Sequence, residues 1–400
     1  MDRREFLQKF GAGSAAVALS ACGGSPDAGR YTEADIALLA AQRAAEAAQS
    51  GRGPFGVHRY QGYRGLAELP WFDLDAQGGL ICVDDSLPKA IDVHCHLGMS
   101  YLFRPTLDLQ AATARVKHLL DCDAEQPGCD LDLDVYINSN FTEAGLDQLQ
   151  KSTLAQGLWG SSFARTQTIP NLLSEMDAMR VEQAFILPIK LGLPFGDNLS
   201  EHWLAEIDKA GAGQRLKAGW SVHPRDDDRL AQIRAGAAAG CKVLKLHPTV
   251  QRFYPDDESM MAVYELAEEL GLTIFFHGGR AGIEPEASHP YAMPRHYQGA
   301  IANFPKLNFV LLHAGARDFE AMLELAVSHD NAWLGIHGQS LTNLDTMIRR
   351  TGGERLLFGS DWPFYHLGAS LAKVLITTDS PARRNIRSAI LRDNAEALFA

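Results

Sequence analysis

The sequence predicts an α/β protein, a (β/α)8 TIM barrel with an insertion after its first strand and an N-terminal arm. Two observations support this prediction. From Ala90 onward, eight short apolar runs alternate with longer segments whose apolar residues recur at helical spacing. Each repeat is therefore expected to be a strand followed by a helix, and eight such units close into a barrel. The chain has 400 residues, 46% of them hydrophobic, which is enough to bury a core of that size.

The start of the chain has the pattern of an export signal. Residues 2–9 resemble a twin-arginine motif, and residues 11–21 form a weakly apolar run that is too short to span a bilayer. The run ends in Leu19-Ser20-Ala21-Cys22, which resembles a bacterial lipobox. We expect residues 1–21 to be a signal peptide and Cys22 to carry a lipid. The protein would then lie in the bacterial cell envelope, periplasm-facing or on the outer membrane, with the lipid as its only membrane attachment. The alternative is an accidental basic start on a cytoplasmic protein.

Residues 22–89 are expected to form a tether, a helix and a wrapping arm. The segment 23–30 is small and polar. Thr32 is a suitable N-cap with Asp35 three residues later, and the alanine-rich stretch that follows predicts a helix up to Ser50. The remaining residues of the arm show no sustained period, so we expect them to wrap around the barrel without forming a second domain.

The barrel is expected to occupy residues 90–400. Helices are predicted at 169–180, 257–270 and 316–329. About eighty residues separate the first strand from the first of these helices, too many for an ordinary loop. The tract of about 101–165 is therefore predicted to be a subdomain or lid above strand one. The strands are expected to end near His94, Ile189, Val222, Leu246, Phe276, Leu312, Ile336 and Gly359.

The charge of the chain limits its partners. The formal net charge is −12 and no Lys/Arg-rich stripe appears, which argues against nucleic acid. We expect a small-molecule substrate, and the sequence leaves a homodimer open.

The cysteines divide into groups. Cys95 and Cys241 lie in apolar, strand-like runs and are expected to be core thiols. Cys122 and Cys129 flank a polar segment, and an oxidising compartment would permit a disulfide between them. Cys82 has no assigned role.

Polar residues at the strand ends predict a metal centre. His94 and His96 are two positions apart at the end of the first strand, where such positions point to the same face. Imidazole and carboxylate groups suit Zn²⁺ and related ions, and the carboxyl ends of barrel strands are where such sites assemble. The later strands contribute His247, His277, His313 and Asp361.

Together these motifs resemble the amidohydrolase superfamily. The nearest branch is the amidohydrolase-related group, which contains aminocarboxymuconate-semialdehyde decarboxylase and related lactonases and hydrolases. The resemblance covers roughly residues 90–399. The motifs are Asp92-Val93-His94-Cys95-His96, Lys245-Leu246-His247-Pro248, Phe276-His277-Gly278-Gly279, Leu312-His313-Ala314-Gly315, Gly359-Ser360-Asp361-Trp362-Pro363 and the run from Asp393 to Phe399.

The resemblance implies one divalent ion, Zn²⁺ by preference with Mn²⁺ as the alternative, and no second metal. Its ligands would be His94, His96, His277 and Asp361. His313 would contact the substrate or the metal-bound water.

Most of these residues also have a plainer interpretation. His277 could bond to backbone, although the two glycines after it would let the chain approach a ligand closely. His313 could bind the metal, or it could support the ligands without touching the metal. Asp361 could be ligand, general base or helix N-cap. Asp92 is expected to orient the two first-strand histidines.

Three further residues complete the candidate site. Lys245 lies at the end of the predicted fourth strand, where some relatives carry a carbamylated lysine that bridges two metals. Without that modification, Lys245 would support the ligands and not bind the metal. His247 is expected to contact substrate. Arg280 could clamp a substrate carboxylate or form a surface salt bridge.

Three functions fit this pattern. The first is a metal-dependent hydrolase, in which Asp361 deprotonates water and the ion polarises a lactone, amide or ester carbonyl. The second is a nonoxidative decarboxylase of a small aromatic or unsaturated carboxylic acid, which would use the same ligands. The third is a noncatalytic binding lipoprotein, which should have lost a ligand. Envelope location favours hydrolysis, and the absence of a Gly-x-Ser-x-Gly motif disfavours a serine nucleophile.

Overall fold

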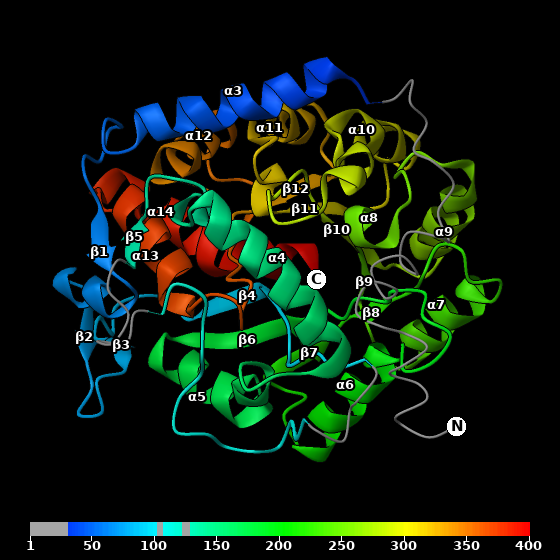
Figure 1. Ribbon diagram of the computed structural model, residues 1–400, viewed down its shortest axis with the longest axis horizontal. Coiled ribbons are helices and arrows are strands. Elements are labelled where there is room, and N and C mark those ends of the chain that lie inside the picture. The colour runs from blue at the N-terminus through cyan, green and yellow to red at the C-terminus, as the bar shows by residue number, and fades with distance from the viewer. Residues whose placement is uncertain (1–30, 102–106, 122–128) are drawn as a thin grey trace. The chain divides into compact units, whose positions relative to one another are not determined.

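The computed structural model describes residues 31–101, 107–121 and 129–400 (Figure 1). The chain divides into two units, residues 1–38 and 39–400. Helix α3 (Glu33–Gln49) includes residues of both units, and at its start the amide of Thr32 donates to Asp35 Oδ2 at 2.8 Å. This helix confirms the prediction for that stretch. The proposed signal peptide and Cys22 lie outside the described residues.

Eight parallel strand positions form the predicted barrel in the second unit. The third position consists of two pieces divided at Gly219, whose N–H still donates to Ile186 O at 2.8 Å. The ring closes where Val93 N–H donates to Phe358 O at 3.0 Å. The strands are β4 (Ala90–Cys95), β6 (Val181–Ile186), β7 (Leu216–Ala218) with β8 (Trp220–Ser221), β9 (Val243–Leu246), β10 (Thr273–His277), β11 (Phe309–Leu312), β12 (Ala332–Gly335) and β13 (Leu356–Leu357).

Amphipathic helices alternate with these strands, as the periodicity predicted. Most of them pack against the outside of the strands and bury one face, whereas Leu367–Thr377 is buried throughout and Arg384–Ser388 has no buried residue. The longer ones are α5 (Ile169–Ala178), α6 (Leu199–Lys209), α7 (Arg229–Ala238), α9 (Glu258–Glu269), α10 (Pro294–Asn303), α11 (Phe319–Ser328), α12 (Leu341–Thr351) and α13 (Leu367–Thr377). The shorter ones are α8 (Pro248–Gln251), α14 (Arg384–Ser388) and α15 (Asn394–Leu398). Inside the barrel, a separate apolar cluster includes Val93, Phe185 and Phe275, and Phe399 stacks on Phe185 with ring centroids 4.3 Å apart.

The segment between β4 and β6 has structure of its own. It contains β5 (Asp130–Asp132) and helix α4 (Glu143–Trp159), which crosses in front of the strands in Figure 1. Strand β5 pairs antiparallel with β1 (Arg59–Gln61) of the N-terminal arm. The arm therefore forms a sheet with the insertion as well as wrapping around the barrel. The local sequence pattern does not predict this pairing, because the two strands are far apart in the chain.

The arm also holds a hairpin of β2 (Phe72–Leu74) and β3 (Leu80–Cys82). Among the described cysteines, Cys95 and Cys241 are buried free thiols, as predicted. Cys129 is disulfide-bonded, but Cys122 lies outside the described residues, so their pairing stays a prediction.

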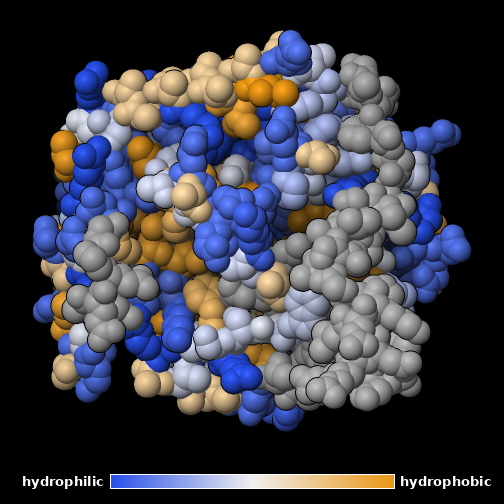
Figure 2. All heavy atoms as spheres, in the orientation of Figure 1, coloured by the Kyte–Doolittle hydropathy of each residue, from blue (hydrophilic) through white to orange (hydrophobic). Residues whose placement is uncertain are grey.

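No helix in the described part of the chain is both long enough and apolar enough to cross a membrane. On the face shown in Figure 2, the described surface is mainly hydrophilic, and hydrophobic residues form smaller patches between the hydrophilic ones.

Candidate metal centre

The carboxylate of Asp361 lies against the two histidines of the first strand. Its Oδ1 is 3.3 Å from His94 Nε2 and 3.1 Å from His96 Nε2. His313 joins this group from β11: one ligand atom each from His94, His313 and Asp361 lie within 4.8 Å of one another. Three strand ends that are far apart in sequence thus converge on one point.

An unusual backbone conformation presents Asp361 at this point. The residue has φ 59°, in the left-handed region, which costs a non-glycine residue about 1–3 kcal/mol. Hydrogen bonds from Asp361 N–H to His94 O (2.8 Å) and from His96 N–H to Trp362 O (2.6 Å) offset this cost. The loop after β13 is therefore fixed to the end of β4, which contains His94 and is followed directly by His96.

Neighbouring groups also fix the histidines. His96 Nδ1 donates to Leu187 O at 2.6 Å, which turns Nε2 toward Asp361. Asp92 Oδ1 accepts from the backbone N–H of His94 at 2.9 Å and of Ser360 at 3.2 Å. Burial raises the pKa of Asp92 to about 7. These contacts fit the orienting role predicted for Asp92.

The electrostatics of the cluster favour neutral imidazoles. Burial lowers the pKa of five histidines well below 6.5, with smaller contributions from neighbouring titratable groups; they are His94, His247, His277, His313 and His337. A neutral ring keeps a lone pair for a metal. Nδ1 of His94, Nδ1 of His313 and Nε2 of His337 are buried without a hydrogen-bond partner. This donor set fits a divalent cation.

His277 lies beside this group, with its ring next to that of His313. Its ring centroid is 4.7 Å from that of His313 and 4.0 Å from that of His247, on which it stacks at 9°. His247 Nδ1 pairs with Thr249 Oγ1 at 3.0 Å. Lys245 is buried nearby, where desolvation lowers its pKa to about 7 although Asp361 raises it. The sequence-predicted residues Lys245, His247 and His277 thus lie at the same end of the barrel as His313.

His337 is a member of the cluster that sequence reasoning missed. Its Nε2 lies 3.7 Å from Asp361 Oδ2, and its ring is 5.4 Å from that of His313. The signal was present, because His337 directly follows the apolar run that ends at Ile336.

Arg280 contradicts the predicted carboxylate clamp. The side chain is inaccessible to solvent, and its Nε and Nη2 bond Asp318 at 2.9 and 2.6 Å. A guanidinium held this way neutralises a buried carboxylate, so neither the clamp nor a surface salt bridge describes it.

The two glycines before Arg280 explain its position. A Cβ on Gly279 would lie 1.8 Å from Gly315 O, and one on Gly278 would lie 2.6 Å from Leu312 O. These glycines therefore let the loop after β10 approach the loop after β11. The expected close approach is to neighbouring backbone, and no ligand is needed to explain it.

A second buried group lies behind the loop of Asp361. His118 Nε2 bonds Glu175 Oε2 at 2.8 Å, and His366 Nε2 lies 3.7 Å from Glu175 Oε1. Backbone and indole N–H groups of Leu367 and Trp362 also donate to this carboxylate. Because both oxygens of Glu175 already accept hydrogen bonds, the group is a buried ion-pair network.

A (β/α)8 barrel with histidines and an aspartate gathered at the carboxyl ends of its strands defines a class: the metal-dependent barrel enzymes. A family model, Amidohydro_2 (amidohydrolase), matches residues 91–400, and the chain belongs to this family. Proteins of the family are metal-dependent enzymes that bind a divalent ion.

Solved structures share the fold. An uncharacterized TIM-barrel protein, Bb4693 from Bordetella bronchiseptica, has a TM-score of 0.54 at 18% identity over 78% of this chain and 98% of its own. 5-Carboxyvanillate decarboxylase LigW from Sphingomonas paucimobilis has 0.50 at 17% identity over 78% and 98%. A 2,6-dihydroxybenzoate decarboxylase complexed with 2,6-dihydroxybenzoate has 0.50 at 18% identity over 63% and 94%. No curated protein matches significantly.

Proposed function

We propose that this protein is a metal-dependent hydrolase that acts on the lactone, amide or ester carbonyl of a small molecule. The observation that carries the proposal is the position of Asp361. Its carboxylate lies within 3.1–3.3 Å of two histidine nitrogens. It is also the most exposed of the three, with 14% of its side chain accessible against 1% and 4% for His94 and His96. A carboxylate that faces both the ligands and the open end of the site is suited to proton transfer.

A divalent ion held by His94, His96, Asp361 and their histidine neighbours would polarise a carbonyl and acidify water. Asp361 takes the proton from the attacking water and returns it to the leaving group. His313, neutral because of its burial, can hold a hydrogen bond to the substrate oxygen through a nitrogen that has no other partner. Asp92 and Leu187 keep the first-strand histidines oriented during this exchange.

Turnover of a defined panel tests this proposal. The purified enzyme, loaded with Zn²⁺, is incubated with aryl lactones, amides, esters and aromatic carboxylates, with detection of released acid and of CO₂. We expect acid from at least one lactone, amide or ester. Release of CO₂ with no hydrolysis would overturn the hydrolase assignment.

Nonoxidative decarboxylation is the second candidate. Two of the structures with the same fold are decarboxylases of substituted benzoates, although a likeness at 17–18% identity supports the fold alone. The specific observation that favours it is an aromatic wall: Phe364 lies against the ring of His96, with ring centroids 5.9 Å apart. A benzoate ring could pack there with its carboxylate at Asp361.

We further propose Zn²⁺ as the resident ion, with Mn²⁺ as the alternative. Imidazole-rich sites with one carboxylate suit zinc, whereas manganese prefers a larger share of oxygen ligands. Elemental analysis of protein purified without chelators distinguishes the two.

For location, we propose export by the twin-arginine route and lipid attachment at Cys22. Support comes from the sequence motifs alone. Replacing Arg3 and Arg4 with Lys should leave the enzyme in the cytoplasm, and Cys22→Ala should release it into the periplasm. If both variants still fractionate with the membrane as the native chain does, the export proposal is wrong.

A further inference from the structure

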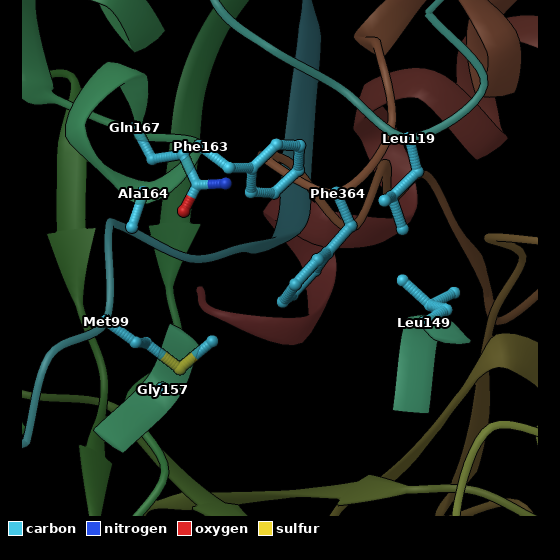
Figure 3. A pocket seen from close by; sticks show the side chains of 8 residues that line it. All are labelled: Met99, Leu119, Leu149, Gly157, Phe163, Ala164, Gln167 and Phe364. Carbon is cyan, nitrogen blue, oxygen red and sulfur yellow. The ribbon is translucent and has the colours of Figure 1, made fainter. Parts of the chain in front are cut away.

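A small cavity lies under the insertion, and Figure 3 shows the side chains that line it. Its volume is about 30 Å³, which is room for about one water molecule. Its walls are mainly apolar, with Gln167 among them, and none of the described lining residues belongs to the candidate metal centre. The contacts that bear on the metal centre come instead from the loops after β11 and β12.

The loop after β11 has an unusual backbone. Three of its residues other than glycine have φ in the left-handed region: His313 at 59°, Ala314 at 43° and Ala316 at 50°. Such a conformation is unfavourable for a residue with a Cβ, and it persists only where surrounding contacts determine it. Because the loop begins with His313, the contacts that hold the loop also set the direction of that side chain.

The ring of His313 depends on its backbone for its orientation. The ring of His96 is fixed by a bond from Nδ1 to Leu187 O, whereas Nδ1 of His313 has no partner among the described residues. The N–Cα bond of His313 continues from β11. A return of φ from 59° to an ordinary value near −60° would therefore rotate its Cβ about that bond by about 120°. The ring would then leave the group that it forms with His94 and Asp361.

Gln339, in the loop after β12, holds this turn in place. Its Nε2 donates to His313 O at 2.6 Å and to Ala316 O at 2.8 Å, so one amide joins the two ends of the turn. Its Oε1 accepts from Asn343 Nδ2 at 2.8 Å. The residue is 1% exposed, so water cannot replace these bonds without a rearrangement.

The loop that carries Gln339 is itself fixed. Lys373, from the buried helix α13, donates from Nζ to Gln339 O at 2.6 Å. The same loop contains His337, two residues before Gln339, and His337 Nε2 lies 3.7 Å from Asp361 Oδ2. The amide that holds the turn after β11 therefore has a fixed place beside the candidate metal centre.

We propose that Gln339 is a positioning residue for the reaction. Its amide keeps the turn after β11 in the left-handed conformation and thereby keeps the ring of His313 at the candidate metal centre. Gln339 acts through His313 and needs no contact with the substrate. The inference rests on the proposed function in giving His313 a hydrogen bond to the substrate oxygen, but the position of the ring can be measured without a substrate.

Gln339→Met tests the position of the ring, because methionine has nearly the same length but cannot donate a hydrogen bond. Nuclear magnetic resonance spectra of the Zn²⁺-loaded protein, labelled in its histidine rings, are recorded for the wild type and the variant. The signal of His313 is the one that His313→Ala removes. We expect this signal to shift or broaden in Gln339→Met. An unchanged signal in the folded variant would overturn the proposal, and Gln339→Leu repeats the measurement should Gln339→Met fail to fold.

Asn331→Leu is the matched control. Asn331 directly precedes β12, whereas Gln339 follows it, so the two amides lie at opposite ends of one strand. Asn331 is also buried, and its Nδ2 also donates to backbone carbonyls, which are those of Ile301, Phe304 and Leu307 at 3.0, 2.9 and 3.1 Å. The control should lower the free energy of unfolding but leave the His313 signal unchanged. Equal changes of that signal in both variants would reduce the effect of Gln339 to general stability and overturn the proposal.

Kinetics connect the position of the ring to the reaction. On a substrate found with the panel, Gln339→Met should lower kcat about 10- to 100-fold, as is typical for residues that orient a metal site, with little change in KM. In a His313→Ala background the same substitution should lower kcat less than about twofold, because the group through which it acts is gone. The same factor in both backgrounds, or a normal kcat in Gln339→Met alone, would overturn the proposal.

The two proposals fail separately. If the substrate panel shows no hydrolysis but the His313 signal changes as expected, the positioning of the ring holds and the reaction assignment fails. If hydrolysis occurs and the signal does not change, the reverse is true.

Discussion

The carboxylate of Glu175 on helix α5 accepts a hydrogen bond from the indole N–H of Trp362 at 3.1 Å, and Trp362 directly follows Asp361. The same carboxylate accepts from Leu367 N–H at 2.9 Å and from His118 Nε2 at 2.8 Å. A helix that precedes the second strand thus anchors both sides of the loop after the eighth strand. The position of the candidate base depends on this distant, buried anchor.

Glu175→Gln should therefore destabilise the protein. Loss of one partner of a buried ion pair costs about 3–5 kcal/mol, because the remaining charge stays buried. Chemical denaturation at pH 6 measures the change. Glu324→Gln, which removes one side of the exposed pair with Arg350, is the matched control and should leave the midpoint unchanged. Equal midpoints for Glu175→Gln and wild type would mean that the network contributes nothing.

The buried pair of Glu175 and His118 also predicts how the stability of the protein depends on pH. Burial alone would raise the pKa of Glu175, but His118 and His366 lower it to about 2. The stability that this carboxylate gives the folded protein is therefore complete above pH 4.5 and is lost as the pH falls through about 2. Burial alone would lower the pKa of His118, but Glu175, with smaller effects of the Pro363 carbonyl and Asp121, raises that pKa above 6.5. The stability that His118 contributes is complete below pH 6.5 and is lost as the pH rises through the higher pKa that this histidine has in the folded protein. The difference between wild type and Glu175→Gln should thus be largest between pH 4.5 and 6.5, and a difference that grows above pH 8 would contradict the assignment.

Removal of a candidate ligand should remove the metal. His94→Ala and His277→Ala are each expected to lose metal and activity while the barrel stays folded. The loss in metal affinity should exceed the roughly 10- to 100-fold typical of residues behind the ligands. Elemental analysis and circular dichroism measure the two properties. His329→Ala, at a histidine that bonds Leu325 O away from the cluster, should keep its metal; full occupancy in both test variants would contradict the ligand assignment.

Substitution of the candidate base should affect turnover more than binding. In Asp361→Asn the amide oxygen can still coordinate, but it cannot take a proton. We expect kcat to fall about 10²–10⁴-fold with a much smaller change in KM. Steady-state kinetics at matched metal occupancy measure both constants. A near-normal kcat would assign the base elsewhere, with His313 as the next residue to replace.

The close approach at Gly279 should be intolerant of a side chain. Gly279→Ala places a Cβ 1.8 Å from Gly315 O at φ +70°, so the loop after β10 must move. Gly271→Ala is the matched control, because Gly271 has φ +62° but open space around it. The unfolding free energy of the control should fall only by the left-handed backbone cost of about 1–2 kcal/mol, and that of Gly279→Ala should fall clearly more. Equal unfolding free energies for the two variants would show that the contact relaxes freely.

The sequence by itself determined the barrel and its first-strand site. The side chains of a strand alternate between its two faces and those of a helix repeat every 3.6 residues, so burial of one face leaves a local pattern in the sequence. From that pattern the eight strand positions and helices such as α9 and α11 could be predicted within a few residues. The two-residue spacing of His94 and His96 has the same local origin. The strands of the arm could not be predicted this way, because each has only three residues, too few to show a period.

Only the tertiary structure decided which side chains meet between loops. Arg280 meets Asp318 because the loops after β10 and β11 pack together through glycine backbone, and no local pattern encodes that contact. Glu175 anchors Trp362 for the same reason, because this contact depends on how elements from different parts of the barrel pack. Gln167 lies in an apolar pocket only because the insertion folds back over the barrel. Local chemistry specifies the strands and helices, whereas packing between them determines which polar groups become partners and which stay available for a ligand.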